Sequence, residues 1–432
     1  MRTIPYNEAP DEMDQYAVCE FIGKNGRLPI FGKDMTLYWL NNVTKQPLTE
    51  REIAYFKNLP ADQLKPGLFS LRVPYILHPY LSYILSGFLI KCVNFFSTNP
   101  YHFLVAARLI SAISGALTAL LTYKIAMRLF INRFDVAVLS AVFVGVLPQM
   151  TFTNSYVNSD AFSAMSATLI FLMWLKCLDS WKWQHIALLG CALGLLGLSK
   201  INTYSILILT GIFLSGYLRA GWKNNLRIIG TIMICAFAVS GWYFVRNKII
   251  YNFFFMPHIN INEFLAQSDQ VLLKNMAQHK LEISNFSILS LFLKWSFESF
   301  VGRFGWMNIR MPQAVYQIFL ILIVSGIAGF MKSYSAAKFK SGRHRSTFML
   351  MCSLFFLLFV MSLFFSIIFD FQAQGRYLFP AIAPFAIALS IGWLSISNKA
   401  AVTRLSFISI LALLIGINIF SFVVCIVNCY YF

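Results

Sequence analysis

Long apolar runs alternate with short polar connectors along most of the chain. Each run contains roughly 17–25 residues, the length that an α-helix needs to cross a bilayer. We expect spans near 103–123, 134–152, 161–178, 183–199, 203–219, 226–246, 313–331, 347–369, 378–397 and 405–427. The pattern predicts an all-α, polytopic membrane protein whose helices form a bundle.

Composition and charge agree with this interpretation. The chain is 58% hydrophobic and 12% charged, with a mean hydropathy of +0.66, whereas a soluble globular protein carries about 25% charged residues. The net charge of +18 could suit a nucleic-acid partner, but residues 1–72 contain nine basic and nine acidic side chains and are neutral. The excess lies in the rest of the chain, where many of the cations occupy short connectors. Basic short loops mark the cytoplasmic side of a membrane protein, so the charge indicates topology and no nucleic-acid partner.

The basic connectors predict an orientation in the cell (inner) membrane. They place Lys338 in the cytoplasm and Arg376 on the extracytoplasmic side. Asp11 is extracytoplasmic if the apolar stretch at 73–97 lies along the outer surface, as we expect, and cytoplasmic if that stretch crosses. We therefore expect an acidic extracytoplasmic segment at 1–102 that includes helices on the membrane surface. Residues 103–432 would form a bundle of about ten transmembrane helices, with a long extracytoplasmic loop at 247–312.

The apolar stretch at 73–97 allows two interpretations. Its length permits a crossing, but Pro74, His78, Pro79 and Lys91 disfavour one. We expect it to lie along the outer surface of the membrane. An exported N-terminal segment needs a signal or a helix before it, so we also expect a first transmembrane helix upstream of Met1.

An acidic cluster occurs in the sequence "NEAPDEMDQY". It contains Glu8, Asp11, Glu12 and Asp14. Carboxylates that crowd in a cleft raise the pKa of at least one of them, which suits a general base or the binding of a divalent cation such as Mg or Mn. A solvated loop is the alternative interpretation, and the sequence leaves the presence of a metal open.

Other charged residues are candidates for binding an anion. Arg246, Arg303 and Arg376 lie at the outer ends of apolar runs. Their guanidinium groups match phosphate oxygens in a bidentate manner, although such residues also serve as interfacial anchors. Lys200 lies between two apolar runs, where a charge is costly and suggests function. Asp160 begins a predicted span, where an acid could equally cap the helix.

An ordered set of motifs resembles the GT-C superfamily of membrane glycosyltransferases. The resemblance is strongest to the bacterial branch related to protein O-mannosyltransferases and aminoarabinose transferases, and to a bacterial membrane family with "SFWG-FGW" and "QGRYL-P" signatures. The matching motifs span almost the whole chain: "EAPDE" at 8–12, "GRLP" at 26–29, "HPYLSYIL" at 78–85, "ARLIS" at 107–111, "WYFVRN" at 242–247, "SFVGRFGW" at 299–306 and "QGRYLFP" at 374–380. Gln15, where many relatives carry His, and Tyr80, where they carry a second proline, depart from the pattern.

The resemblance implies a glycosyltransferase that uses a polyprenyl-phosphate sugar and inverts the anomeric carbon. Asp11 would be the general base, while Glu12 and Asp160 would orient the acceptor or a divalent cation. The carrier phosphate would bind to the basic candidates, namely Arg376, Arg246, Lys200 and Arg303.

Three other functions stay open at this point. A transporter or flippase would also carry charges within the membrane, but the sequence shows no inverted repeat. An O-antigen polymerase or ligase also handles lipid-linked sugars, and a non-catalytic assembly partner is the third possibility. The sequence does not identify the sugar or the acceptor, which could be a glycan, a lipid or a protein.

Overall fold

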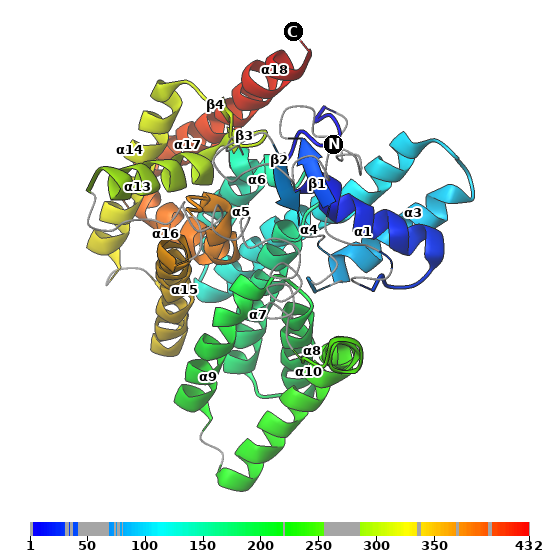
Figure 1. Cartoon of the computed structure of the whole chain (residues 1–432). Helices are drawn as coiled ribbons and strands as arrows, with labels where there is room; N and C mark the ends of the chain where they lie inside the picture. Colours follow the sequence, from blue (N-terminus) through cyan, green and yellow to red (C-terminus); the bar gives the residue numbers. More distant parts are fainter. Residues whose placement is uncertain are drawn as a thin grey trace.

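The structure is a computed structural model of the whole chain (Figure 1). It describes residues 3–30, 34, 38–41, 69–72, 75, 78–79, 81–218, 221–254, 286–334, 338–368, 371–395 and 400–431. Helices dominate the described part, with two short antiparallel hairpins. The protein is an all-α, polytopic membrane protein, as the apolar pattern predicts.

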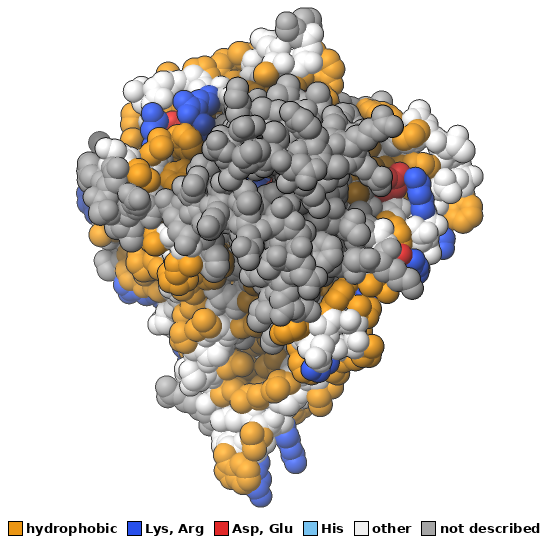
Figure 2. Space-filling view, viewed as in Figure 1, with side chains coloured by type: hydrophobic (Ala, Val, Ile, Leu, Met, Phe, Trp, Pro, Cys, Tyr) orange, Lys and Arg blue, Asp and Glu red, His pale blue; other side chains and the backbone are white. Residues whose placement is uncertain are grey.

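Seven helical segments of the described chain are long and apolar enough to cross a bilayer. They are α4 (Pro100–Leu129), α7 (Asp160–Asp179), α10 (Trp222–Tyr251), α14 (Gln313–Ser333), α15 (Gly342–Ile368), η4 with α16 (Gly375–Ala381 and Ile382–Leu394), and α17 with η5 and α18 (Ala400–Phe420, Ser421–Val427 and Asn428–Tyr431). In Figure 2, apolar side chains cover much of the periphery that is described, which suits contact with lipid.

Three of the ten expected spans correspond to shorter helices. These are α5 (Phe134–Val146), α8 (Trp183–Gly197), and η2 with α9 (Ile201–Tyr204 and Ser205–Tyr217). The expected span at 134–152 is divided, because Pro148 begins a separate short helix, α6 (Pro148–Thr153). Proline has no N–H to continue a helix but is favourable in its first turn. Apolar helices therefore occur at all ten expected positions, and the lengths of three were overestimated.

Helix α7 lies at the centre of the bundle and is buried along most of its length. It packs against α4, α8, α15 and η4. Small residues on α7 allow this close approach, and the hydroxyls of Ser163, Ser166 and Thr168 bond to carbonyls one turn earlier. Its 20 residues rise about 30 Å, the thickness of the hydrocarbon layer. The helix is thus long enough for Asp160 and Asp179, at its two ends, to lie at opposite surfaces of a membrane.

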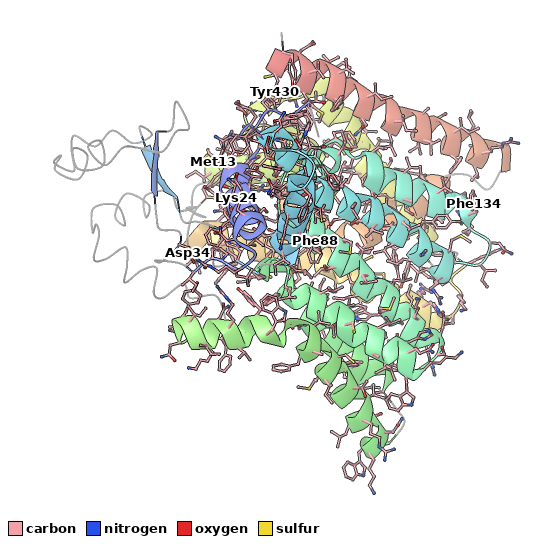
Figure 3. All side chains as sticks on the ribbon, turned by 90° about the vertical axis from the view of Figure 1, so that its right-hand side faces the viewer. Met13, Lys24, Asp34, Phe88, Phe134 and Tyr430 are labelled. Atoms are coloured by element: carbon pink, nitrogen blue, oxygen red, sulfur yellow. The ribbon has the colours of Figure 1, made fainter. Side chains whose placement is uncertain are left out.

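Two short helices near the N-terminus form a tightly packed pair. Helices α1 (Glu12–Asn25) and α3 (Leu81–Asn94) each contain 14 residues, and α3 also packs against α4. A Cβ on Gly23 or Gly87 would lie 2.8 Å from an isoleucine methyl of the facing helix, so glycine permits the contact. In Figure 3, Lys24 of α1 and Phe88 of α3 mark this pair, which lies well away from Phe134. At about 21 Å, α3 is too short to cross the bilayer alone, and its position on the membrane surface stays a prediction.

Two short hairpins complete the described fold, and Phe304 and Ile309 of one of them are part of the hydrophobic core. Strands β1 (Tyr38–Asn41) and β2 (Phe69–Arg72) pair with each other, as do β3 (Arg303–Phe304) and β4 (Ile309–Arg310). The β3–β4 hairpin follows α13 (Phe286–Val301), which packs against η4. The expected outer loop at 247–312 thus contains a helix and a hairpin, while its part at 255–285 lies outside the described residues.

Candidate functional site

Charged side chains from distant parts of the sequence meet at one end of α7. Nη2 of Arg376 lies 3.2 Å from Oδ2 of Asp11, and Nη1 lies 3.6 Å from Oδ2 of Asp160. Nζ of Lys200 lies 2.7 Å from Oδ1 of Asp160. These four residues, two cations and two carboxylates, form the site. All four were expected from the sequence.

Arg376 is positioned by the backbone turn that carries it. A Cβ on Gly375 would lie 2.2 Å from the backbone N of Phe300, so only glycine allows η4 to approach α13 this closely. The N–H of Gly375 donates to Oγ of Ser299 at 2.7 Å. Nε of Arg376 donates to Oε1 of Gln374 at 2.7 Å. The guanidinium is thus held in one orientation before any ligand binds.

Asp11 is the more accessible of the two carboxylates. Its side chain is 26% exposed, against 6% for Asp160. Asp11 precedes α1 in a left-handed conformation with φ of 63°, a region that Asp and Asn enter more readily than most residues. This conformation turns the chain at the start of α1, next to Arg376.

Asp160 is bound to a cation, and another residue caps its helix. Oδ1 of Asn158 accepts the N–H of Ala161 at 2.9 Å at the start of α7. The carboxylate of Asp160 instead meets Lys200 and Arg376. The carboxylate of Asp160 therefore makes no described capping hydrogen bond, although it lies in the first turn of α7, where an acid is favourable.

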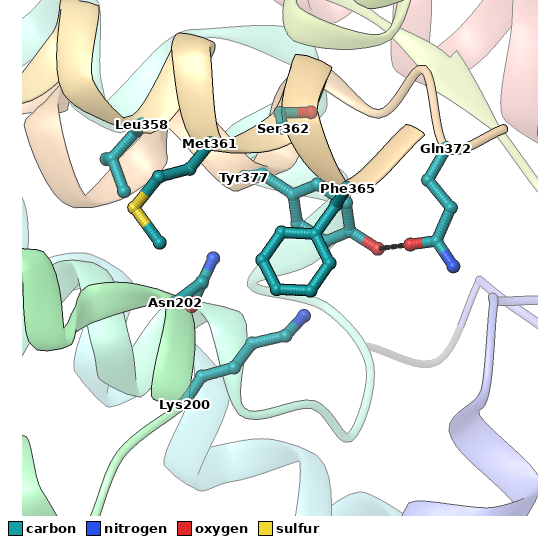
Figure 4. A pocket seen from close by; sticks show the side chains of 8 residues that line it. All are labelled: Lys200, Asn202, Leu358, Met361, Ser362, Phe365, Gln372 and Tyr377. Carbon is teal, nitrogen blue, oxygen red and sulfur yellow. Dashed lines mark hydrogen bonds between the residues drawn. The ribbon is translucent and has the colours of Figure 1, made fainter. Parts of the chain in front are cut away.

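An apolar cavity of about 180 Å³ adjoins Lys200. Figure 4 shows the ammonium of Lys200 near the ring of Tyr377, whose hydroxyl donates to Gln372 at 2.6 Å. The distance from Nζ of Lys200 to the ring centroid is 4.7 Å. Most of the remaining wall comes from α15, and the other lining residues are Asn202, Leu358, Met361, Ser362 and Phe365. The cavity is apolar along most of its wall and charged at one end.

Glu12 lies in a different environment from its neighbour Asp11. It is fully buried, and its two oxygens accept from Nε and Nη2 of Arg108 on α4, both at 2.7 Å. Oε1 also accepts the N–H of Val157 at 3.0 Å. These contacts fix the start of α1 to α4 and to the loop before Asp160. Glu12 therefore positions Asp11 and does not face a substrate, which corrects the expectation that it orients the acceptor.

Two of the four expected phosphate ligands are engaged elsewhere. Nη2 of Arg246 donates to the carbonyl of Pro29 at 2.7 Å. Nε of Arg303 donates to the carbonyl of Met307 at 2.6 Å. Of the basic candidates, only Lys200 and Arg376 meet at the end of α7, so assigning Arg246 and Arg303 to the same phosphate is not supported by their contacts.

The sequence interpretation missed two residues that support the site. Arg108 is a lone charge inside an apolar run, and that signal alone could have identified it. Tyr156 accepts from Nη1 of Arg376 at 2.9 Å. Burial raises the pKa of Tyr156, so its phenol stays neutral and binds the guanidinium without neutralising it. No sequence signal distinguishes Tyr156 from the other tyrosines.

A metal ion has no evident ligand set in the part of the chain that the structure describes. No group of three or more His, Cys, Asp or Glu side chains is arranged there to hold one. Lys200 and Arg376 lie against the carboxylate of Asp160, where a cation would otherwise bind. The described residues therefore offer no ligand set for Mg or Mn, and a divalent cation stays a prediction.

Replacement of Glu12 by Gln should lower stability rather than turnover. The change removes the charge from a buried, doubly hydrogen-bonded pair with Arg108, which we expect to cost roughly 1–3 kcal/mol of unfolding free energy. Thermal unfolding in a mild detergent would measure the loss. A fall of turnover per folded molecule as large as that of Asp11→Asn would instead place Glu12 in the chemistry.

Comparison with known proteins relates this fold to solved structures. ArnT from Cupriavidus metallidurans, bound to undecaprenyl phosphate, has a TM-score of 0.51 at 14% identity, over 95% of this chain and 61% of that chain. The Archaeoglobus fulgidus oligosaccharyltransferase tethered to an acceptor peptide has a TM-score of 0.52 at 13% identity, over 96% and 52%. AglB from Archaeoglobus fulgidus, in complex with an inhibitory peptide and a dolichol-phosphate, has a TM-score of 0.50 at 13% identity, over 95% and 51%. The chain thus spans about half to three fifths of the length of these relatives.

The likeness confirms the expected GT-C fold. No curated protein matches the sequence. A family described as predicted membrane protein (DUF2142) matches residues 66–385. Since this match covers most of the chain, the protein belongs to that membrane protein family, and its fold is of the GT-C type.

Proposed function

We propose that the protein is an inverting glycosyltransferase that moves a sugar from a polyprenyl-phosphate carrier to a hydroxyl acceptor. The observation that carries the proposal is the contact between Arg376 and Asp11, beside a cavity that is apolar along most of its wall. One site thereby holds a cation for a phosphate, a carboxylate for a hydroxyl proton, and room for a lipid chain.

Arg376 and Lys200 would bind the carrier phosphate. As the glycosidic bond breaks, the bonding electrons move to the phosphate oxygen, so negative charge increases there. Fixed cations stabilise that charge in the transition state more than in the ground state. Arg376 is already oriented by Gln374 and Tyr156, so little reorganisation is needed when the bond breaks.

Asp11 would accept the proton of the acceptor hydroxyl as the hydroxyl oxygen attacks the anomeric carbon. Its exposure leaves it open to a second substrate, whereas Asp160 is enclosed between Lys200 and Arg376. Attack opposite the departing phosphate in a single displacement inverts the anomeric carbon. Asp160 would hold the two cations in place during this step.

The cavity beside Lys200 would take the first isoprenoid units of the carrier. Its apolar wall suits a hydrocarbon chain, and its charged end lies at the proposed phosphate site. Among the structural neighbours, one holds undecaprenyl phosphate and another a dolichol-phosphate. These neighbours support a lipid-phosphate donor in the present protein, while the sugar is not indicated.

The proposed active site faces the extracytoplasmic side. At the opposite end of α7, Asp179 binds Arg128 and Lys340 at 2.6 and 2.5 Å, and more cations follow in the nearby connectors. Cations concentrate on the cytoplasmic side, which supports this orientation. Lys338 would then be cytoplasmic, and Asp11 and Arg376 extracytoplasmic.

Cleavage of a carrier-linked sugar would test the proposal. Purified protein in liposomes should release free polyprenyl phosphate from a panel of synthetic polyprenyl-phosphate sugars when cell-envelope extract supplies acceptors. Thin-layer separation of a radiolabelled sugar would follow its transfer, and Arg376→Ala would be the control. Movement of the donor across the bilayer without cleavage would instead indicate a flippase, and joining of diphosphate-linked glycans would indicate a polymerase or ligase.

A further inference from the structure

A second group of cations lies near the proposed active site, around the buried carboxylate of Glu298. Oε2 of Glu298 lies 3.6 Å from Nη1 of Arg303 and 3.8 Å from Nε of Arg310, and Oε1 lies 4.0 Å from Nζ of Lys294. Figure 2 shows Lys and Arg atoms gathered around a small acidic area in this region, at the upper left. We call these four residues the Glu298 cluster.

The Glu298 cluster has too much positive charge for its single carboxylate. Three cations face one acid, and burial together with the charge of Arg310 lowers the pKa of Arg303. In the described part of the chain, Nη1 of Arg303 and Oε2 of Glu298 are buried and make no hydrogen bond. A cation held where its charge is unfavourable is typical of a ligand site. An anion with about two negative charges would balance the group.

The cluster is also open to a ligand on one side. Side chains of Lys294 and Arg310 are 56% and 49% exposed, whereas Arg303 is 8% exposed. The guanidinium of Arg303 stacks 4.6 Å from the ring centroid of Trp295, which fixes its plane. Two exposed cations thus flank one buried cation.

The elements that carry this cluster contact both halves of the proposed active site. Ser299, next to Glu298, binds the N–H of Gly375, next to Arg376. From the β3–β4 hairpin, Nε1 of Trp306 donates to the carbonyl of Asn7 at 2.8 Å, in the segment that leads to Asp11. Hydrogen bonds thus link the elements that carry the cluster to the turn of Arg376 and to the segment that leads to Asp11.

We propose that the Glu298 cluster binds a phosphate group of the acceptor, through Lys294, Arg303 and Arg310. This inference rests on the proposed function and adds to it that the acceptor is a phosphate-bearing glycan or lipid. A phosphate monoester carries about 1.5 to 2 negative charges at neutral pH, which matches the charge excess of the cluster. Guanidinium groups also match its oxygens in geometry.

Calorimetric titration of the purified full chain with inorganic pyrophosphate, in a neutral detergent, would test the inference. Wild-type protein should bind at two sites. The double variant Lys294→Gln/Arg310→Gln should lose one of them, with affinity reduced at least 10-fold, and Arg376→Ala should lose the other. Lys248→Gln is the matched control, because Lys248 is an exposed cation whose described contacts are with Asn252 and the ring of Phe254. It should keep both sites.

The titrations distinguish a failure of this inference from a failure of the proposed function. If the double variant retains both sites, the inference is overturned while the carrier site stands. If Arg376→Ala retains both, the proposed function fails at its phosphate site. Titrations in nanodiscs of phosphatidylcholine, with and without phosphatidylglycerol, identify the source of the phosphate. Loss of only the Lys294/Arg310-dependent site in the anionic nanodiscs would show that bilayer lipid occupies the cluster, and would overturn the acceptor assignment.

Discussion

Replacement of Asp11 by Asn is expected to reduce turnover by about 10²–10⁴-fold, the usual range for loss of a general base. The change removes the charge but keeps the size of the side chain. The backbone should be undisturbed, because Asn7, Asn132 and Asn252 already adopt the positive φ that this position requires. Transfer of sugar from a synthetic polyprenyl-phosphate donor, per folded molecule, would measure the loss.

The same variant should keep its affinity for the carrier, or bind it more tightly. Nη2 of Arg376 contacts Asp11 in the present structure, so a phosphate that binds Arg376 competes with this carboxylate. Glu20→Gln is the matched control, since Glu20 also lies on α1 and pairs only with the exposed Lys24 among the ion pairs described. Near-normal turnover of Asp11→Asn would rule out Asp11 as the base, and Glu8 and Asp14 would be tested next.

Replacement of Arg376 by Ala should lower turnover by about 10²–10³-fold, as for the loss of a preorganised group that stabilises a developing negative charge. Arg376→Lys keeps the charge but loses the planar arrangement of donors. It should be intermediate, with Ala worse than Lys by roughly 1–3 kcal/mol in activation free energy. Initial rates at saturating donor, normalised to folded protein, would establish the order.

An interfacial anchor would behave differently. If Arg376 only held the protein in the membrane, both variants would lower thermal stability and leave turnover per folded molecule unchanged. Arg246→Ala provides the comparison, because Arg246 binds the carbonyl of Pro29 outside the described contacts of the site. It should reduce stability with little effect on normalised turnover. Equal turnover in all of these proteins would remove Arg376 from the site.

The pattern of apolar residues determined the class of the protein and the position of its helices. This was possible because solvation by lipid acts on each segment separately: a run of sufficient length and apolarity forms a helix whatever its neighbours are. Apolarity alone could not predict the length of a helix that a backbone break interrupts, as at Pro148, where a separate helix begins. The sequence also suggested the four charged residues that meet at the end of α7, each for a different reason. Lys200 was conspicuous because a charge between apolar runs is costly. Asp11 belongs to an acidic cluster, and Asp160 and Arg376 lie at the ends of apolar runs, so the resemblance was needed to assign them to the site.

Only the tertiary structure decided which of those charges act together. Asp11 and Arg376 are 365 residues apart in the sequence, and Glu12 and Arg108 are 96 apart. The adjacent acids Asp11 and Glu12 look alike in the sequence, yet one meets Arg376 beside the cavity and the other is buried against α4. Arg303 was expected to bind the same phosphate as Arg376, but in the structure it pairs with Glu298. Helix formation is local, whereas the partner of a charge depends on how helices pack, and that packing is set by long-range contacts such as the approach of Gly375 to Phe300.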